Sequence, residues 1–164
     1  MSCILFDWGD TLMQVYPQYS GAMVNWPEVA ALPGAVETLA VLHSGYHLAV
    51  ATNAQDSDET EIWAALQRVD LAEHLDKVYC FRSVGFCKPS QEFFHFILKD
   101  LDLLPEEVIM VGDDWEVDVQ GAVQSGLRAI WLNIRSTEHC SGSGYQTIHS
   151  LLDLPQTLMH WGFR

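Results

Sequence analysis

Two carboxylates stand close together at the end of the first apolar run of the chain. The segment CILF (3–6) leads into Asp7, and Asp10 follows within three residues. Such a pair is either a nucleophile with an acid/base partner, or the end of a strand followed by a helix N-cap. The spacing by itself leaves both interpretations open.

Polar residues also stand at the ends of later segments. Thr52 closes the run HLAVAT (47–52), and Asn53 follows it. Lys88 precedes a segment with helical spacing. The stretch GDDWEVD (112–118) begins at the end of the run EVIMVG. Each has an ordinary structural explanation, because Asn suits turns, a loop lysine is usually solvated, and acids favour a helix N-terminus. Taken together and in this order, they are better explained by one site.

The segments that must position these residues alternate between short apolar runs and longer helical patterns. The predicted strands and helices are, in chain order, 3–6, 33–45, 47–52, 56–69, 77–81, 89–101, 107–112, 115–126 and 128–133. The strands are almost continuously apolar, which is typical of a parallel sheet buried on both faces. The order βαβαβαβαβ therefore predicts an α/β fold, a three-layer Rossmann-like arrangement with about five parallel strands and helices on both faces.

Open sheets of this kind bind ligands at the carboxyl ends of their strands. Asp7, Thr52 with Asn53, and Asp113 with Asp114 all follow predicted strands directly. We therefore expect these polar residues to gather at one edge of the sheet.

Composition restricts the classes of partner. The 164 residues suit a single domain (1–164), and the net charge is −14 with eight Lys and Arg, none before Arg68. Nucleic-acid affinity depends on basic residues that neutralise phosphates, so neither nucleic acid nor an anionic membrane is an expected partner. The N-terminus lacks the pattern of a signal peptide, and the four Cys and seven His lack metal-ligand spacing. We expect a cytoplasmic protein without structural zinc.

Two segments fall outside the βα repeat. Residues 13–32 are rich in Tyr, Trp, Pro and Met, and they form either a small lid over the site or a cover for the sheet edge. This segment carries no cation, so it is not expected to hold a highly anionic leaving group. Residues 134–147 read as a Ser/Gly-rich loop that leads to an apolar, helical tail.

Four motifs resemble those of the haloacid dehalogenase-like (HAD) hydrolases, and they occur in that family's order over most of the chain. They are ILFDWGDT with Asp7, LAVATNA with Thr52, GFCKPSQEFF with Lys88, and VIMVGDDWEVD with Asp113 and Asp118. The resemblance implies the HAD-like fold and a phosphatase, a phosphoric monoester hydrolase, with a minimal cap.

The resemblance also implies a nucleophile and a metal site. Asp7 would attack phosphorus and form an aspartyl-phosphate. Mg²⁺ would be held by Asp7, the backbone carbonyl of Gly9 and Asp113, since hard oxygen ligands suit this ion. Asp118 would support these ligands without being a direct one, and Asp114 is the alternative candidate for that role.

The remaining motif residues would bind the phosphate. Thr52 would donate a hydrogen bond to a phosphoryl oxygen, and the backbone N–H of Asn53 would assist. Lys88 would neutralise negative charge on the phosphate and on Asp7.

The first motif departs from the family pattern. Phosphatases of the family carry an acid/base Asp two residues after the nucleophile, where this chain has Gly9. The neighbouring Asp10 is then either the replacement acid/base or a structural cap, because an offset of one residue in a helical turn rotates a side chain by roughly 100°. The loss of this group makes a catalytically weak or inactive binding or regulatory protein the alternative to a phosphatase.

Two other activities of the family are disfavoured. Its dehalogenases use an Arg near the first motif and lose the metal-binding GD, and its phosphonatases use a Lys from the cap. Here no Arg precedes Arg68, no Lys precedes Lys77, and GDD (112–114) is present.

The expected partner is a phosphorylated substrate, either a small molecule or a macromolecule that a minimal cap would admit. Oligomerisation is open, with Trp26, Trp161 and Phe163 as residues that an intersubunit contact would bury.

Overall fold

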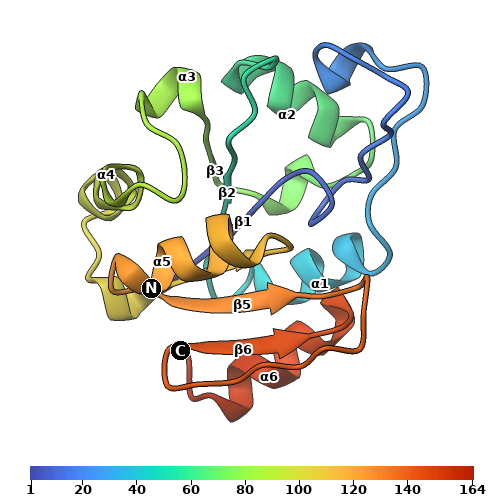
Figure 1. Ribbon diagram of the computed structural model, residues 1–164. Coiled ribbons are helices and arrows are strands. Elements are labelled where there is room, and N and C mark those ends of the chain that lie inside the picture. The colour runs from blue at the N-terminus through green and yellow to red at the C-terminus, as the bar shows by residue number, and fades with distance from the viewer.

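Six parallel strands form one sheet in the computed structural model, which describes residues 1–164 (Figure 1). The strands are β1 (Cys3–Phe6), β2 (His47–Ala51), β3 (Lys77–Tyr79), β4 (Val108–Gly112), β5 (Arg128–Leu132) and β6 (Tyr145–Ile148). Their order in the sheet is β3-β2-β1-β4-β5-β6, and every neighbouring pair is parallel. The predicted α/β fold with a parallel sheet is confirmed.

The sixth strand was not predicted, because the sequence indicates about five. β6 lies at the end of the stretch 134–147 that reads as a loop, and it pairs with β5 from Tyr145 to Ile148. It is an edge strand in which only its last two residues are buried. An edge strand needs no continuous apolar run, so its short segment YQTI carries little strand signal.

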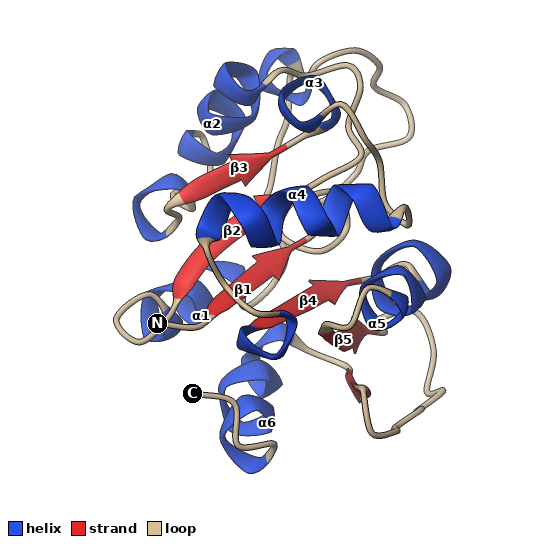
Figure 2. Cartoon of the chain, turned by 90° about the vertical axis from the view of Figure 1, so that its left-hand side faces the viewer, coloured by secondary structure: helices blue, strands red, loops and turns tan.

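Helices cover both faces of the sheet, as predicted. They are α1 (Ala35–Leu42), α2 (Glu59–Gln67), α3 (Phe81–Val84), α4 (Gln91–Leu101), α5 (Gly121–Gln124) and α6 (Leu154–His160). Figure 2 shows α4 crossing one face, and its buried residues share a core with those of α3 and α5. The buried residues of α1, α2 and α6 belong to a second core on the other face.

The alternation of side chains along β1 divides it between these two cores. Cys3 and Leu5 belong to the α4 side, whereas Ile4 and Phe6 belong to the α1 side, and all four are fully buried. A strand that is covered on both faces reads as an unbroken apolar run, which is why CILF was recognisable in the sequence.

The helix predicted over residues 115–126 has two parts. Trp115–Gln120 forms a π-helical turn, and α5 follows it directly. Such wide turns are rare and occur mostly at functional sites. The short helix α3 was not predicted.

The segment 13–32 packs beside α2 rather than extending into solvent. It contains a 3₁₀ turn, Met23–Asn25, which lies next to α2 at the blue end of the chain in Figure 1. Arg68 Nη1, just after α2, donates to the carbonyl oxygens of Val24 (2.9 Å) and Trp26 (2.7 Å). Two hydrogen bonds from one guanidinium therefore attach this segment to the helix.

The C-terminal tail folds back as the predicted helix, α6, and Phe163, one of the three residues named for a contact between subunits, is not available for one. Its side chain is buried within its own chain and stacks on Tyr46, with ring centroids 5.8 Å apart. No helix of the chain is long and apolar enough to cross a membrane.

Candidate active site

The carboxyl ends of the central strands meet at one edge of the sheet. β1 lies between β2 and β4, and the three strands run parallel, so the residues after them are neighbours. Asp7 follows β1, Thr52 follows β2, and Asp113 follows β4. The structure thus brings together residues that lie more than one hundred positions apart in the chain.

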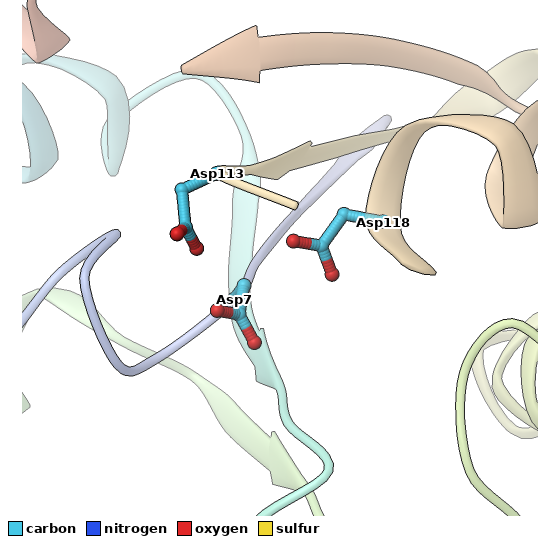
Figure 3. A group of neighbouring side chains, drawn as sticks. All are labelled: Asp7, Asp113 and Asp118. Atoms are coloured by element: carbon cyan, nitrogen blue, oxygen red, sulfur yellow. The ribbon is translucent and has the colours of Figure 1, made fainter. Parts of the chain in front are cut away.

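Three carboxylates converge at this edge, as Figure 3 shows. Oxygen atoms of Asp7, Asp113 and Asp118 all lie within 4.8 Å of one another. Asp118 comes from the π-helical turn after β4 and is almost fully buried. Such a group of oxygen ligands suits a hard divalent cation.

The ammonium group of Lys88 lies between two of these carboxylates. Lys88 Nζ is 2.8 Å from Asp7 Oδ1 and 2.7 Å from Asp118 Oδ1, and only 1% of the lysine side chain is exposed. Burial alone would lower the pKa of this lysine, but the charges of Asp7 and Asp118 raise its pKa above the ordinary value. Lys88 therefore remains a cation in the interior and compensates both acids.

The Asn53 side chain holds the backbone of Lys88 on both sides. Its Nδ2 donates to the Lys88 carbonyl oxygen, its Oδ1 accepts from the Lys88 N–H, and both distances are 2.8 Å. We expected only the backbone N–H of Asn53 to act in the site. The side chain has this second role because the loops after β2 and α3 meet, which no local sequence pattern reveals.

The two acids after Asp113 have different positions. The Asp118 carboxylate accepts the Asp114 N–H through Oδ2 (3.1 Å), while its other oxygen binds Lys88. The Asp114 side chain points instead to the helix N-terminus and accepts the N–H groups of Glu116 and Val117. The structure brings Asp118 into the cluster and leaves Asp114 as a cap.

Gly112 is required by the position of Asp118. A Cβ atom at residue 112 would lie 2.1 Å from Asp118 Oδ2, well inside contact distance. The GD pair of the fourth motif therefore has a packing reason as well as a chemical one.

Burial raises the pKa of Asp118 to about 7, and the ammonium of Lys88 limits that rise.

Asp113 is bound by two groups that the sequence interpretation did not include. Thr11 Oγ1 donates to Asp113 Oδ1 (3.2 Å), and Arg135 Nη2 lies 3.0 Å from Asp113 Oδ2. Burial and the charge of Asp7 raise the pKa of Asp113 to about 6, although Arg135 and Thr11 oppose the rise. Arg135 stands three residues after β5, at the same edge of the sheet, and this position is the signal that identifies it.

Asp10 lies on the Asp113 side of the site. Its φ of 58° is a left-handed conformation that favours Gly. Asp10 Oδ1 accepts the N–H of Val15 (2.9 Å), and Oδ2 pairs with Arg135 Nη2 (2.9 Å). Both of its oxygens thus have partners in the protein.

A pocket of about 300 Å³ opens beside Asp7. It is lined by Asp7, Trp8, Gly9, Val15, Gly21, Met23, Trp26, Thr52, Asn53, Ala54, Gln55, Asp56 and Ser57. Asp10 is not among the lining residues, whereas Gly9 is. The sequence interpretation did not include the stretch Gln55–Ser57 in the site. Its place in the chain, shortly after Asn53, is the signal that could have identified it.

Comparisons with known proteins agree with this geometry. The haloacid dehalogenase-like hydrolase family model matches residues 6–132. Pyrimidine 5′-nucleotidase YjjG of Escherichia coli is 30% identical over 77% of this chain and 56% of its own length. A glyceraldehyde 3-phosphate phosphatase of Methanothermobacter thermautotrophicus is 34% identical over 70% of this chain and 50% of its own length. The chain thus spans about half the length of these curated relatives.

Solved structures of similar size share the fold. An uncharacterized protein of Listeria monocytogenes serotype 4b is 26% identical, with a TM-score of 0.83 and 99% of both chains covered. A 2-haloacid dehalogenase of Pseudomonas syringae pv. Tomato DC3000, 20% identical, has a TM-score of 0.78. Since the family model covers most of the chain and the residues of its four motifs meet at one sheet edge, this chain is a member of the haloacid dehalogenase-like hydrolase family.

Proposed function

We propose that this chain is a Mg²⁺-dependent phosphomonoesterase that works through an aspartyl-phosphate on Asp7. One observation carries the proposal: Asp7 lines the pocket while the buried ammonium of Lys88 binds its Oδ1. The other carboxylate oxygen, Oδ2, has no hydrogen-bond partner in the protein. A carboxylate with one oxygen held and one free is suited to attack phosphorus.

Thr52 and Asn53 support a phosphate site in the same pocket. The Thr52 hydroxyl accepts the Ala54 N–H at 3.1 Å, so its own proton is available to a phosphoryl oxygen. Lys88 compensates the charge that accumulates when a phosphate approaches Asp7.

The residues present fit Mg²⁺. Asp7 and Asp113 would hold it together with the carbonyl of Gly9, which accepts no backbone hydrogen bond. Asp118 would orient Lys88 rather than bind the metal, because it is held inside the protein by the buried Lys88 ammonium and the Asp114 N–H, whereas the Arg135 that pairs with Asp113 is exposed. A bound Mg²⁺ would polarise the phosphoryl oxygens as a Lewis acid and offset the repulsion between the carboxylates.

We assign no side-chain acid to the leaving group. Gly9 offers no acid, and we assign Asp10 a structural role because Val15 and Arg135 occupy its oxygens outside the pocket. The leaving group then departs without help from a side-chain acid. We expect aryl phosphates, whose leaving groups need little protonation, to be hydrolysed much faster than alkyl phosphates.

The substrate of this proposal is a phosphorylated small molecule. The segment 13–32 contributes Val15, Gly21, Met23 and Trp26 to the pocket wall, so we propose that it acts as a small lid. The phosphatase names of the curated relatives support the same reaction class.

A second candidate, a phosphate-binding protein without turnover, is favoured by Gly9 alone. Purified protein assayed with p-nitrophenyl phosphate separates the two candidates. With Mg²⁺ present we expect turnover that Asp7→Asn lowers by at least about 10³-fold. An acid-quenched sample should carry one phosphoryl group on the peptide that contains Asp7. Equal rates for the wild type and Asp7→Asn would reject the phosphatase and leave the binding protein.

A further inference from the structure

The pocket beside Asp7 has an unusual charge balance for a site that accepts a phosphate. Among its 13 lining residues there are two carboxylates, Asp7 and Asp56, and no Lys, Arg or His. The nearest cation, Lys88, is buried between Asp7 and Asp118 and is not a lining residue. The part of the pocket that would receive the leaving group is therefore negative.

Asp56 is the carboxylate whose charge is free to attract or repel a charged group on the leaving group. Asp7 is paired with Lys88 and reserved for the phosphate, whereas the exposed Asp56 makes no ion pair or side-chain hydrogen bond within the protein. Its loop is held at the far end by Asp58, which accepts the Glu61 N–H (2.8 Å) as the N-cap of α2. The position of Asp56 at the pocket is thus determined by the start of this helix.

The segment 13–32 contributes an aromatic side chain to the same pocket. Trp26 Nε1 donates to the carbonyl oxygens of Ser20 (3.2 Å) and Gly21 (3.1 Å), which orient the indole. Tyr19 packs on this indole with ring centroids 5.7 Å apart. An aromatic ring together with an unpaired carboxylate is a combination that attracts an ammonium group and disfavours an anion.

We infer that this pocket selects phosphomonoesters whose leaving group carries an amine cation over those that carry a second acid group, and that Asp56 determines this preference. The inference rests on the proposed phosphatase function and assigns it a substrate class. Cations are absent from the whole lining of the pocket and not only from the segment 13–32, and Asp56 is the residue that would set the preference for an amine.

The size of the effect follows from Coulomb's law. Two unit charges about 6 Å apart in a water-like medium interact strongly enough to change a rate about threefold. Because an ammonium is attracted and a carboxylate is repelled by the same amount, the ratio between two such substrates should change by about tenfold when Asp56 is neutralised. The change should shrink as salt screens the charges.

The test compares three aryl phosphates that differ at the para position. They are the 4-(2-aminoethyl)phenyl, the 4-(carboxymethyl)phenyl and the neutral 4-ethylphenyl esters. One CH₂ group separates the carboxylate from the ring and two separate the ammonium, so the three phenol leaving groups have similar basicity and need protonation to a similar extent. We expect the wild type with Mg²⁺ to have the highest kcat/KM for the aminoethyl ester and the lowest for the carboxymethyl ester.

The variant Asp56→Asn should lower the aminoethyl-to-carboxymethyl ratio of kcat/KM by about tenfold, and Asp56→Lys should reverse the preference. The matched control is Asp70→Asn, which removes the same charge at the other end of α2 and keeps a residue that tolerates the φ of 58° found there. The control should leave the ratio unchanged.

The outcomes separate this inference from the proposed function. A wild type that hydrolyses all three esters with no preference, or a ratio that Asp56→Asn and Asp70→Asn change equally, overturns the inference and leaves the phosphatase standing. A wild type that hydrolyses none of them, with Asp7→Asn indistinguishable from it, overturns the proposed function and the inference with it.

Discussion

At the scale of single residues, the buried ammonium of Lys88 holds two carboxylates that would otherwise repel each other. Asp7 and Asp118 approach it at 2.8 and 2.7 Å, and Asn53 fixes the backbone from which the lysine extends. Burying ions is costly unless each has a partner. Removing the Lys88 ammonium would therefore leave Asp7 and Asp118 without the positive charge that compensates them.

The first prediction concerns Lys88→Met, which keeps most of the side-chain volume and removes the charge. Two buried carboxylates would then lack their cation, and we expect the free energy of unfolding to fall by about 3–5 kcal/mol. Denaturant unfolding without metal measures this change. Lys99→Met removes an exposed lysine from α4 and should change stability by less than about 1 kcal/mol. Equal effects of the two substitutions would contradict this account.

The second prediction concerns the missing acid/base at residue 9. A Cβ atom at Gly9 would lie 2.9 Å from Val15 Cγ2, so Gly9→Asp needs room that Val15→Ala provides. We expect the double variant to hydrolyse an alkyl phosphate about 10²-fold faster than the wild type, because a positioned acid protonates the poor leaving group. The gain with p-nitrophenyl phosphate should be much smaller, since nitrophenolate leaves without a proton.

Val15→Ala alone is the control for the double variant and should not produce this gain. An equal gain for alkyl and aryl phosphates would show that the substitution enlarges the pocket rather than supplying an acid.

At the scale of elements, the attachment of the segment 13–32 to α2 determines one wall of the pocket. Arg68 holds the carbonyl oxygens of Val24 and Trp26, and Met23, directly before them in the chain, is buried in the core. Most of this segment has no regular structure of its own, so these contacts substitute for helix or strand hydrogen bonds.

The third prediction follows from this attachment. Arg68→Met removes both hydrogen bonds, and we expect faster amide hydrogen exchange over residues 22–27 together with a KM that rises several-fold. Because the chemistry at Asp7 does not involve this arginine, kcat should change less than KM. Arg82→Met, on the exposed side of α3, is the control. A change in kcat with unaltered exchange would place Arg68 in the chemistry instead of in the wall.

At the scale of the whole molecule, converging carboxylates make stability depend on pH in the absence of metal. Burial and Asp7 raise the pKa of Asp113 to about 6, from 3.8. The folded state then binds more protons than the unfolded state between about pH 4 and pH 6, so stability falls as pH rises through this window. Asp100, whose pKa is lowered by its hydrogen bonds to Lys77 and Tyr79, acts in the opposite sense and only below about pH 4.

The fourth prediction is the resulting pH profile. From pH 4 to pH 7 in EDTA, the Asp113 contribution should lower the free energy of unfolding by roughly 2 kcal/mol. Asp113→Asn should remove that part of the slope, and Mg²⁺ should stabilise the wild type more at pH 7.5 than at pH 5. Urea unfolding at a series of pH values measures both effects. A wild-type profile parallel to that of Asp113→Asn would contradict the prediction.

From the amino-acid sequence alone, the parallel α/β fold could be predicted, together with the sheet edge that carries the candidate site. Apolar runs such as CILF are legible because strands buried on both faces need them, and parallel strands necessarily bring their carboxyl ends to one edge. The residues at those ends, Asp7, Thr52 and Asp113, were identifiable for this reason. The edge strand β6 escaped prediction because solvent exposure relaxes its pattern.

Which other side chains reach the site, and which do not, became visible only in the folded chain. The pairing of Asn53 with the Lys88 backbone, and the arrival of Arg135 beside Asp10 and Asp113, join loops that are distant in sequence. Such contacts depend on where loops meet after the strands have packed, and no local periodicity encodes that. The direction of Asp10 was decided in the same way, by a left-handed backbone and by its contacts with the Val15 N–H and Arg135.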